Sequence, residues 1–210
     1  MHPEILSKGQ RVLLPIVKRF KKDFGLVGGT AIALHIGHRQ SVDFDLFSTK
    51  EFKNNDIRKK IAASNQIEKV VRDEKDEYSI VVGGVKFTFL YYPFKIKFTE
   101  KFNDTVSLPS LLTLSAMKAY ALGRRAKWKD YVDLFFVVRD HYKLQEIINT
   151  ARKIFGAEFN EKNFRAQLCY FTDVDFSEKV MYVKNHAVKN AEVQSVLTEF
   201  AVSYGPNHNS

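Results

Sequence analysis

The chain has 210 residues, 45% of them hydrophobic, which is enough to bury one substantial core or two small ones. It shows neither an apolar run of the roughly 18 residues that a membrane helix needs nor a signal-like N-terminus, so we expect a cytoplasmic protein without a membrane partner. A single cysteine, Cys169, excludes an intramolecular disulfide framework, and the net charge of +9 favours polyanionic partners such as RNA, DNA or nucleotide phosphates.

Helices and strands are mixed in the first half of the chain. Hydrophobic spacing predicts helices over residues 9–22 and 30–36, strands over 24–27 and 42–47, a helix to about residue 64, and strands over 67–72, 78–82 and 85–92. Gly37 is expected to end the 30–36 helix, and Gly83 with Gly84 to form a tight hairpin. Because Glu51 follows Ser48 by three residues, a capping box is expected to start the helix after the 42–47 strand.

Composition changes from strand-rich to helix-rich near Leu108 and Pro109. Beyond this point, helices are predicted over residues 109–123, 128–140, 143–155, 160–170 and 176–203. We therefore predict an α+β fold in which a small mixed β-sheet domain, residues 1–107, is followed by a helical domain, residues 108–210.

Two aspartates and a glycine pair are the strongest candidates for chemistry in the first half. Asp43 and Asp45 alternate with apolar residues, so both carboxylates are expected on one strand face, where they could bind Mg²⁺ or Mn²⁺ together with phosphates. Gly28 and Gly29 precede a helix and would let backbone N–H groups approach a triphosphate, to which the Thr30 hydroxyl could also donate. Each half alone is more often a plain turn or a solvated strand face, but their order and spacing together favour a nucleotide site.

These residues also carry a family resemblance. The run GGTAIALHIGHRQSVDFDLF, residues 28–47, resembles the nucleotidyltransferase AbiEii/AbiGii toxin family, a branch of the polymerase-β-like superfamily, and the run AMKAYALGRRAKWKDYVDL, residues 116–134, is similar to the later motifs of that family. The resemblance implies a metal and phosphate site at Gly28, Gly29, Thr30, Asp43 and Asp45. It also implies that Lys118 reaches nucleotide phosphate and that Asp130 completes the site.

Cations could balance the charge of a bound triphosphate. Arg39 is a possible phosphate contact from the first half. Lys118 interrupts an apolar helix and is expected to reach the nucleotide phosphates. The alternative is that Lys118 only extends its amine to solvent from the edge of a core-facing helix. Asp130 would then approach the metal or the acceptor, unless it is only a favourable charge at a helix N-terminus. Around Trp128, which could stack on a base or anchor the core, four cations are candidate nucleic-acid contacts: Arg124, Arg125, Lys127 and Lys129.

One departure concerns the third acid that polymerase-like nucleotidyltransferases place on a later strand. The matching strand here offers Thr88, and a threonine cannot take a proton near neutral pH. Asp130 could substitute, the acceptor could need little base help, or the enzyme could be weak. Asp173 and Asp175 repeat the Asp-x-Asp pattern without upstream glycines and are expected at a turn or a helix entry. We expect His35 to be partly buried rather than a metal ligand.

Together these features predict an enzyme that moves a nucleoside monophosphate from an NTP to a hydroxyl acceptor. The resemblance suggests the toxin of a toxin–antitoxin or phage-defence pair with a cognate antitoxin protein, and the charge suits an RNA acceptor such as the 3′ end of tRNA. Two alternatives stay open at this point. The chain could be a nucleotide- or RNA-binding module whose chemistry has lapsed, or a regulatory protein that docks through its C-terminal helices.

Overall fold

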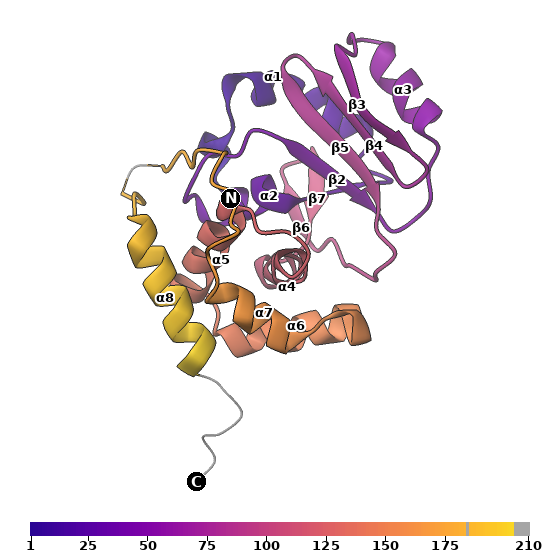
Figure 1. Ribbon diagram of the computed structural model, residues 1–210. Coiled ribbons are helices and arrows are strands. Elements are labelled where there is room, and N and C mark those ends of the chain that lie inside the picture. Colours follow the sequence, from indigo (N-terminus) through magenta and orange to yellow (C-terminus); the bar gives the residue numbers. More distant parts are fainter. Residues whose placement is uncertain (184, 204–210) are drawn as a thin grey trace. The chain divides into compact units, whose positions relative to one another are not determined.

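The computed structural model describes residues 1–183 and 185–203, coloured along the chain in Figure 1. They fall into two compact units, Met1–Ser110 and Leu111–Ser210. The first unit combines a five-stranded mixed sheet with helices, and the elements of the second are helices, so the predicted α+β class is confirmed. The assignment of separate functions to residues 1–107 and 108–210 stays a prediction.

The first unit contains three α-helices and seven strands within its described residues. In chain order they are the short 3₁₀ helix η1 (Pro3–Ile5), α1 (Lys8–Arg19), β1 (Gly25–Val27), α2 (Gly28–Ile36), β2 (Phe44–Ser48), α3 (Asn54–Ala62), β3 (Lys69–Glu74), β4 (Glu77–Val82), β5 (Val85–Tyr91), β6 (Glu100–Phe102) and β7 (Val106–Leu108). The hairpin of β6 and β7 was not predicted, because each strand has only three residues and no clear alternation.

The main sheet has the strand order β1-β2-β5-β4-β3. Only β2 and β5 run parallel, and the other pairs are antiparallel. The β4–β5 hairpin turns at Gly83 and Gly84 with φ angles of +55° and +70°, the conformation that a tight hairpin needs and that glycine adopts without strain.

One face of this sheet carries the core of the first unit. Phe89 of β5 packs against Phe20, which follows α1, with ring centroids 4.7 Å apart. Its register partner Tyr78 of β4 accepts a hydrogen bond from Arg58 of α3 at 3.1 Å. Both helices therefore cover the same face, and the residues that alternate with these core positions, among them Asp45 and Thr88, lie on the other face.

Two local expectations for the first unit are wrong. Ser48 does not cap a helix, because β2 continues through it, its hydroxyl accepts the N–H of Lys50, and α3 begins only at Asn54. Val42 and Asp43 lie outside β2, and Val42 is 40% exposed, so the strand begins at Phe44. The expectation that both aspartates stand on the strand is therefore wrong for Asp43, which immediately precedes it.

The second unit is built from five α-helices and one 3₁₀ helix within its described residues: α4 (Leu111–Leu122), α5 (Trp128–Asp140), α6 (Leu144–Phe155), η2 (Gly156–Glu158), α7 (Glu161–Leu168) and α8 (Asn190–Ser203). Tyr120 of α4 stacks on Phe155 of α6 with ring centroids 4.1 Å apart. The helix predicted over residues 176–203 forms only from Asn190.

Backbone pairing explains why that helix does not begin near residue 176. Asp175 donates its N–H to Ala126 and accepts the N–H of Trp128, which makes an isolated β-bridge, and its side chain accepts the N–H of Ser177. These bonds hold the chain in an extended and turned conformation, as expected for the turn role of Asp175. No helix within the described residues is long and apolar enough to span a membrane.

Candidate functional site

The glycine pair and Asp45 interlock at the junction of β1, α2 and β2. Asp45 is the register partner of Val27, the residue immediately before Gly28. Gly28 has a φ of +70°, and a Cβ at this position would overlap the Asp45 carboxylate. Gly28 is therefore required twice, for its backbone conformation and for the space that Asp45 occupies.

Arg39 lies beside the second glycine. A Cβ on Gly29 would come within 2.6 Å of Nη2 of Arg39 and 3.2 Å of Oγ of Ser41. Arg39 is only 2% exposed, and its Nη1 donates to the carbonyl of Gln40 at 3.0 Å. The guanidinium thus places a buried positive charge next to the first turn of α2, and its direct contact with a phosphate stays a prediction.

Asp43 is positioned through its backbone. Its carbonyl accepts a 2.5 Å hydrogen bond from the hydroxyl of Thr30 and a 3.4 Å hydrogen bond from Nε2 of Gln10. Thr30 is 1% exposed and Gln10 is fully buried. The hydroxyl that was expected to donate to a phosphate therefore already has an acceptor, and Thr30 acts on the aspartate pair by fixing the chain before β2.

The two aspartates are neither buried in the core nor fully exposed. Asp43 and Asp45 both have intermediate burial, and the residue between them, Phe44, is completely buried. Two carboxylates are a suitable oxygen donor set for Mg²⁺, which usually combines one or two protein carboxylates with substrate phosphates. Within residues 1–183 and 185–203, no group of three or more His, Cys, Asp or Glu side chains is placed to hold a metal by itself.

In the second unit, Lys118 and Asp130 meet in a buried cluster of charges. Nζ of Lys118 lies 2.7 Å from Oδ1 of Asp130 and 3.1 Å from Oδ2 of Asp133, and Arg125 reaches the other oxygen of Asp130 at 3.2 Å. The side chains of Lys118 and the two aspartates are at most 6% exposed. Lys118 therefore does not snorkel to solvent, and the approach of Lys118 and Asp130 to the aspartate pair of the first unit stays a prediction.

The four cations around Trp128 are paired with acids of the same unit. Arg124 contacts Glu158 at 3.1 Å, and Arg125 contacts Asp130 as described above. Glu178 bridges Lys127 and Lys129 at 2.7 and 2.9 Å, and these two amines lower the pKa of Glu178 to about 2. A nucleic-acid phosphate would have to compete with these carboxylates, and the assignment of the four cations as contacts stays a prediction.

Trp128 itself is a core residue. It is 4% exposed and its ring lies 5.9 Å from the ring of Tyr131 and 4.8 Å from that of Phe176. The suggestion that Trp128 is available to stack on a base is therefore wrong, because its side chain is buried and packs against two aromatic rings of its own unit.

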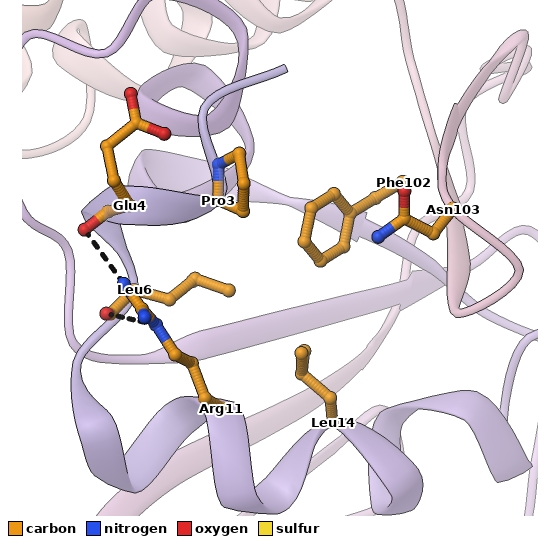
Figure 2. A pocket seen from close by; sticks show the side chains of 7 residues that line it. All are labelled: Pro3, Glu4, Leu6, Arg11, Leu14, Phe102 and Asn103. Atoms are coloured by element: carbon orange, nitrogen blue, oxygen red, sulfur yellow. Dashed lines mark hydrogen bonds between the residues drawn. The ribbon is translucent and has the colours of Figure 1, made fainter.

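One surface pocket of the first unit lies outside the motif residues. Figure 2 shows its lining from η1, α1 and the β6–β7 turn, with Phe102 beside Pro3 and with Arg11 donating to the carbonyls of Glu4 and Leu6. The side chain of Arg11 is engaged by these backbone carbonyls, and most of the remaining lining is apolar. None of the glycines and aspartates of the motif lines this pocket.

Several residues that support the site were not predicted from the sequence. Gln10 carries a readable signal, because Ser7 and Gln10 form a capping box at the start of α1, but its bond to Asp43 spans 33 positions. Ser41 has no such signal. His35 is partly buried as expected, and its Nε2 lies 3.0 Å from the carbonyl oxygen of Pro109.

The chain is similar to known proteins in sequence and in fold. The family model described as the nucleotidyl transferase AbiEii toxin of type IV toxin–antitoxin systems matches residues 15–106. The uncharacterized protein aq_aa25 of Aquifex aeolicus (strain VF5) is 35% identical over 158 residues, which cover 70% of this chain and 75% of that protein.

Two solved structures share the fold with a TM-score of 0.60. JHP933 from Helicobacter pylori is 17% identical, with 93% of this chain and 91% of that chain covered. MenT4, a nucleotidyltransferase toxin from Mycobacterium tuberculosis H37Rv, is 9% identical, with 92% of this chain and 82% of that chain covered. The family match includes the interlocked glycine and aspartate residues described above. The chain therefore belongs to the AbiEii family of nucleotidyl transferase toxins and is a nucleotidyltransferase.

Proposed function

We propose that this nucleotidyltransferase moves a nucleoside monophosphate from a metal-bound NTP to a hydroxyl of RNA, such as the 3′ end of tRNA, and that it is the toxin of a toxin–antitoxin pair. The observation that carries the proposal is the interlock of Gly28 with Asp45. It holds a carboxylate directly against the glycine at the start of α2, so the group proposed to bind the metal lies beside the backbone proposed to bind phosphate.

Asp43 and Asp45 would hold Mg²⁺ or Mn²⁺ together with phosphate oxygens of the nucleotide. When bound, the metal polarises the α-phosphate and neutralises charge on the leaving pyrophosphate. The chain's own contribution is to keep both carboxylates in place. Thr30 and Gln10 fix the backbone of Asp43, and the β1–β2 register fixes Asp45 beside Gly28.

The phosphates are proposed to lie at the N-terminal end of α2. This helix has nine residues, and its first N–H groups have no partner within the helix, so they can donate to phosphate oxygens. Nothing larger than hydrogen projects from Gly28 and Gly29, which permits a close approach of the backbone. The buried charge of Arg39 beside Gly29 adds to the positive potential at this end.

Lys118 and Asp130 are proposed to contribute to the reaction from the second unit. Their 2.7 Å ion pair presents a lysine whose position is fixed by two aspartates, rather than a mobile surface cation. A fixed amine can stabilise charge on a transferring phosphoryl group without reorganising as the reaction proceeds. Replacing Asp130 with Asn would test this role by its effect on kcat.

Charge and family support an RNA acceptor and an antitoxin partner. The net charge of +9 suits a polyanion, and the matching family model is described as a type IV toxin–antitoxin toxin. MenT4 is likewise named a nucleotidyltransferase toxin.

The test is a transfer assay with each α-labelled NTP, Mg²⁺ or Mn²⁺, and total cellular RNA. We expect label in RNA with the wild type, and a loss of at least about 10²-fold with Asp43→Asn or Asp45→Asn, because these half-exposed carboxylates serve chemistry more than packing. Asp56→Asn, an exposed aspartate in the first turn of α3, is the matched control and should retain full transfer.

Equal transfer by the two aspartate variants and the wild type would overturn the metal site. Wild-type protein that binds an NTP in equilibrium dialysis but labels no RNA would instead favour a nucleotide-binding module that has lost its activity. This is the main competing hypothesis, because Thr88 stands where related enzymes have a third acid.

A further inference from the structure

A row of polar side chains starts at the proposed metal site and crosses the face of the sheet opposite α1 and α3. Asp45 of β2 is the register partner of Thr88 of β5, Thr88 is the partner of Ser79 of β4, and Ser79 is the partner of Arg72 of β3. Register partners project to the same face of a sheet, so these four side chains are consecutive neighbours. Asp45 begins a row that extends across four strands.

A carboxylate from β4 joins this row. Oγ of Ser79 lies 2.9 Å from Oε1 of Glu77 and 3.4 Å from Oγ1 of Thr88. Ser79 is 1% exposed, so its hydroxyl depends on these two protein partners rather than on bulk water. Because a carboxylate can only accept, Ser79 donates to Glu77, and its oxygen is left to accept the proton of Thr88.

Because Ser79 has one hydroxyl proton and donates it to Glu77, we assign Thr88 as the donor in the 3.4 Å contact between the two hydroxyls. Donation then runs from Thr88 through Ser79 to Glu77. Glu77 is held from its other side by Arg72, whose Nε lies 3.4 Å from Oε2. The ion pair orients the carboxylate and leaves Oε1 to Ser79.

Resting on the proposed nucleotidyl transfer, we propose that Thr88, Ser79 and Glu77 form a proton relay that replaces the third carboxylate of related nucleotidyltransferases. The acceptor hydroxyl oxygen bonds to the α-phosphorus and the bond to pyrophosphate breaks. In the same concerted step the acceptor proton moves to Oγ1 of Thr88 as Thr88 passes its own proton to Ser79 and Ser79 passes its proton to Oε1 of Glu77, so neither hydroxyl holds an extra proton and Glu77 is the net base. Thr88 touches the reacting hydroxyl, and Ser79 and Glu77 act through it.

The relay is tested by a substitution that removes the basicity of Glu77 but keeps its hydrogen bond with Ser79. Glu77→Gln keeps an oxygen that accepts from Ser79 but removes the proton acceptor, so kcat for labelling total cellular RNA should fall about 10²-fold with KM for the NTP unchanged. Glu74→Gln is the matched control. Glu74 pairs with the same Arg72 at 3.1 Å but has no bond to Ser79, so this variant should keep the wild-type kcat.

A second pair of variants tests the hydroxyl that starts the relay. Thr88→Val has nearly the same shape and removes the hydroxyl, so kcat should fall as in Glu77→Gln, and Thr88→Ser should retain most of the rate. The double variant Glu77→Gln with Thr88→Asp places a carboxylate directly beside Asp45. Its kcat should be at least about tenfold higher than that of Glu77→Gln alone. A structural role of Glu77 would not be rescued from Thr88.

Three outcomes decide between the two proposals. Transfer by the wild type with undiminished kcat in Glu77→Gln overturns the relay and leaves the proposed function standing. A loss in Glu77→Gln that Thr88→Asp does not rescue also overturns the relay. Absence of transfer by the wild type with every NTP overturns the proposed function and the relay with it, and thermal melts of all variants identify any that have lost the fold.

Discussion

Asp45 in the first unit and Asp130 in the second are placed by opposite means. Asp45 is half-exposed and is held by strand register and by the missing side chain of Gly28. Asp130 is buried and is held by the charges of Lys118 and Arg125. From this difference we expect that substituting Asp45 removes the proposed chemistry and spares the fold, whereas substituting Asp130 also leaves buried charges uncompensated.

The largest expected effect comes from breaking the charge balance of the second unit. Lys118→Met removes the ammonium that lies 2.7 Å from Asp130 and 3.1 Å from Asp133, so the free energy of unfolding should fall by about 3–5 kcal/mol in urea titrations. The triple variant Lys118→Met, Asp130→Asn, Asp133→Asn removes the imbalance and should recover most of that loss. If the triple variant is no more stable than Lys118→Met, packing of the lysine stem is the cause instead.

A smaller effect is expected from the glycine of the first unit. Gly28→Ala places a Cβ on the Asp45 carboxylate at a φ of +70°, whereas Gly84→Ala has the same φ of +70° and nothing within 4 Å of its Cβ. Both variants share the backbone strain, so their difference, about 1–3 kcal/mol, isolates the overlap with Asp45. Gly28→Ala should also reduce nucleotidyl transfer, and Gly84→Ala should not.

Equal unfolding free energies for the two alanine variants would mean that Asp45 moves aside at no cost. Retained transfer by Gly28→Ala in the same assay would show that the carboxylate and the glycine act independently, which would remove the contrast between the two regions.

The smallest effect concerns the exposed pairs of the second unit. Glu178 has a pKa of about 2 in the folded chain because Lys127 and Lys129 bond to it, below its ordinary value of 4.5. Because the pKa of Glu178 is lower in the folded than in the unfolded chain, its ionised carboxylate stabilises the folded state at pH values above the unfolded pKa. This contribution is lost as the pH falls from there towards the folded pKa of about 2. Glu178→Gln should therefore lower the free energy of unfolding by at most about 1 kcal/mol. The loss should be the same at about pH 7 and pH 6 and smaller at about pH 3.5.

Urea midpoints of wild type and Glu178→Gln at the three pH values measure this difference. Raising the salt concentration to about 1 M should reduce it, because exposed ion pairs are screened. A difference that grows at pH 3.5 would show that Glu178 is not held by the two lysines in solution.

Local patterns were sufficient to predict the helix and the strand that surround the catalytic candidates of the first unit. The alternation around Phe44 predicted β2, and the position of Gly37 after α2 predicted its left-handed end, which has a φ of +71°. Such signals lie within a few residues of one another and reflect backbone sterics, so sequence carries them directly.

Contacts between distant positions could not be predicted in the same way. The bond from Gln10 to Asp43 and the row from Asp45 to Glu77 depend on which strands become neighbours and in what register. Similarly, Glu178 lies about 50 positions from the lysines that it bridges, so the cluster around Trp128 could be interpreted as free basic surface. Sequence gives the charges, and tertiary pairing decides which of them are available.

The buried cluster of Lys118, Asp130 and Asp133 also determines how this chain responds to heat. The free-energy cost of removing charged groups from water decreases as temperature rises, while hydrophobic stabilisation levels off. The three charges therefore become a larger fraction of the stability of the second unit near its melting temperature than they are at 25 °C. An apolar replacement of the cluster that is neutral in the cold should lower the melting temperature.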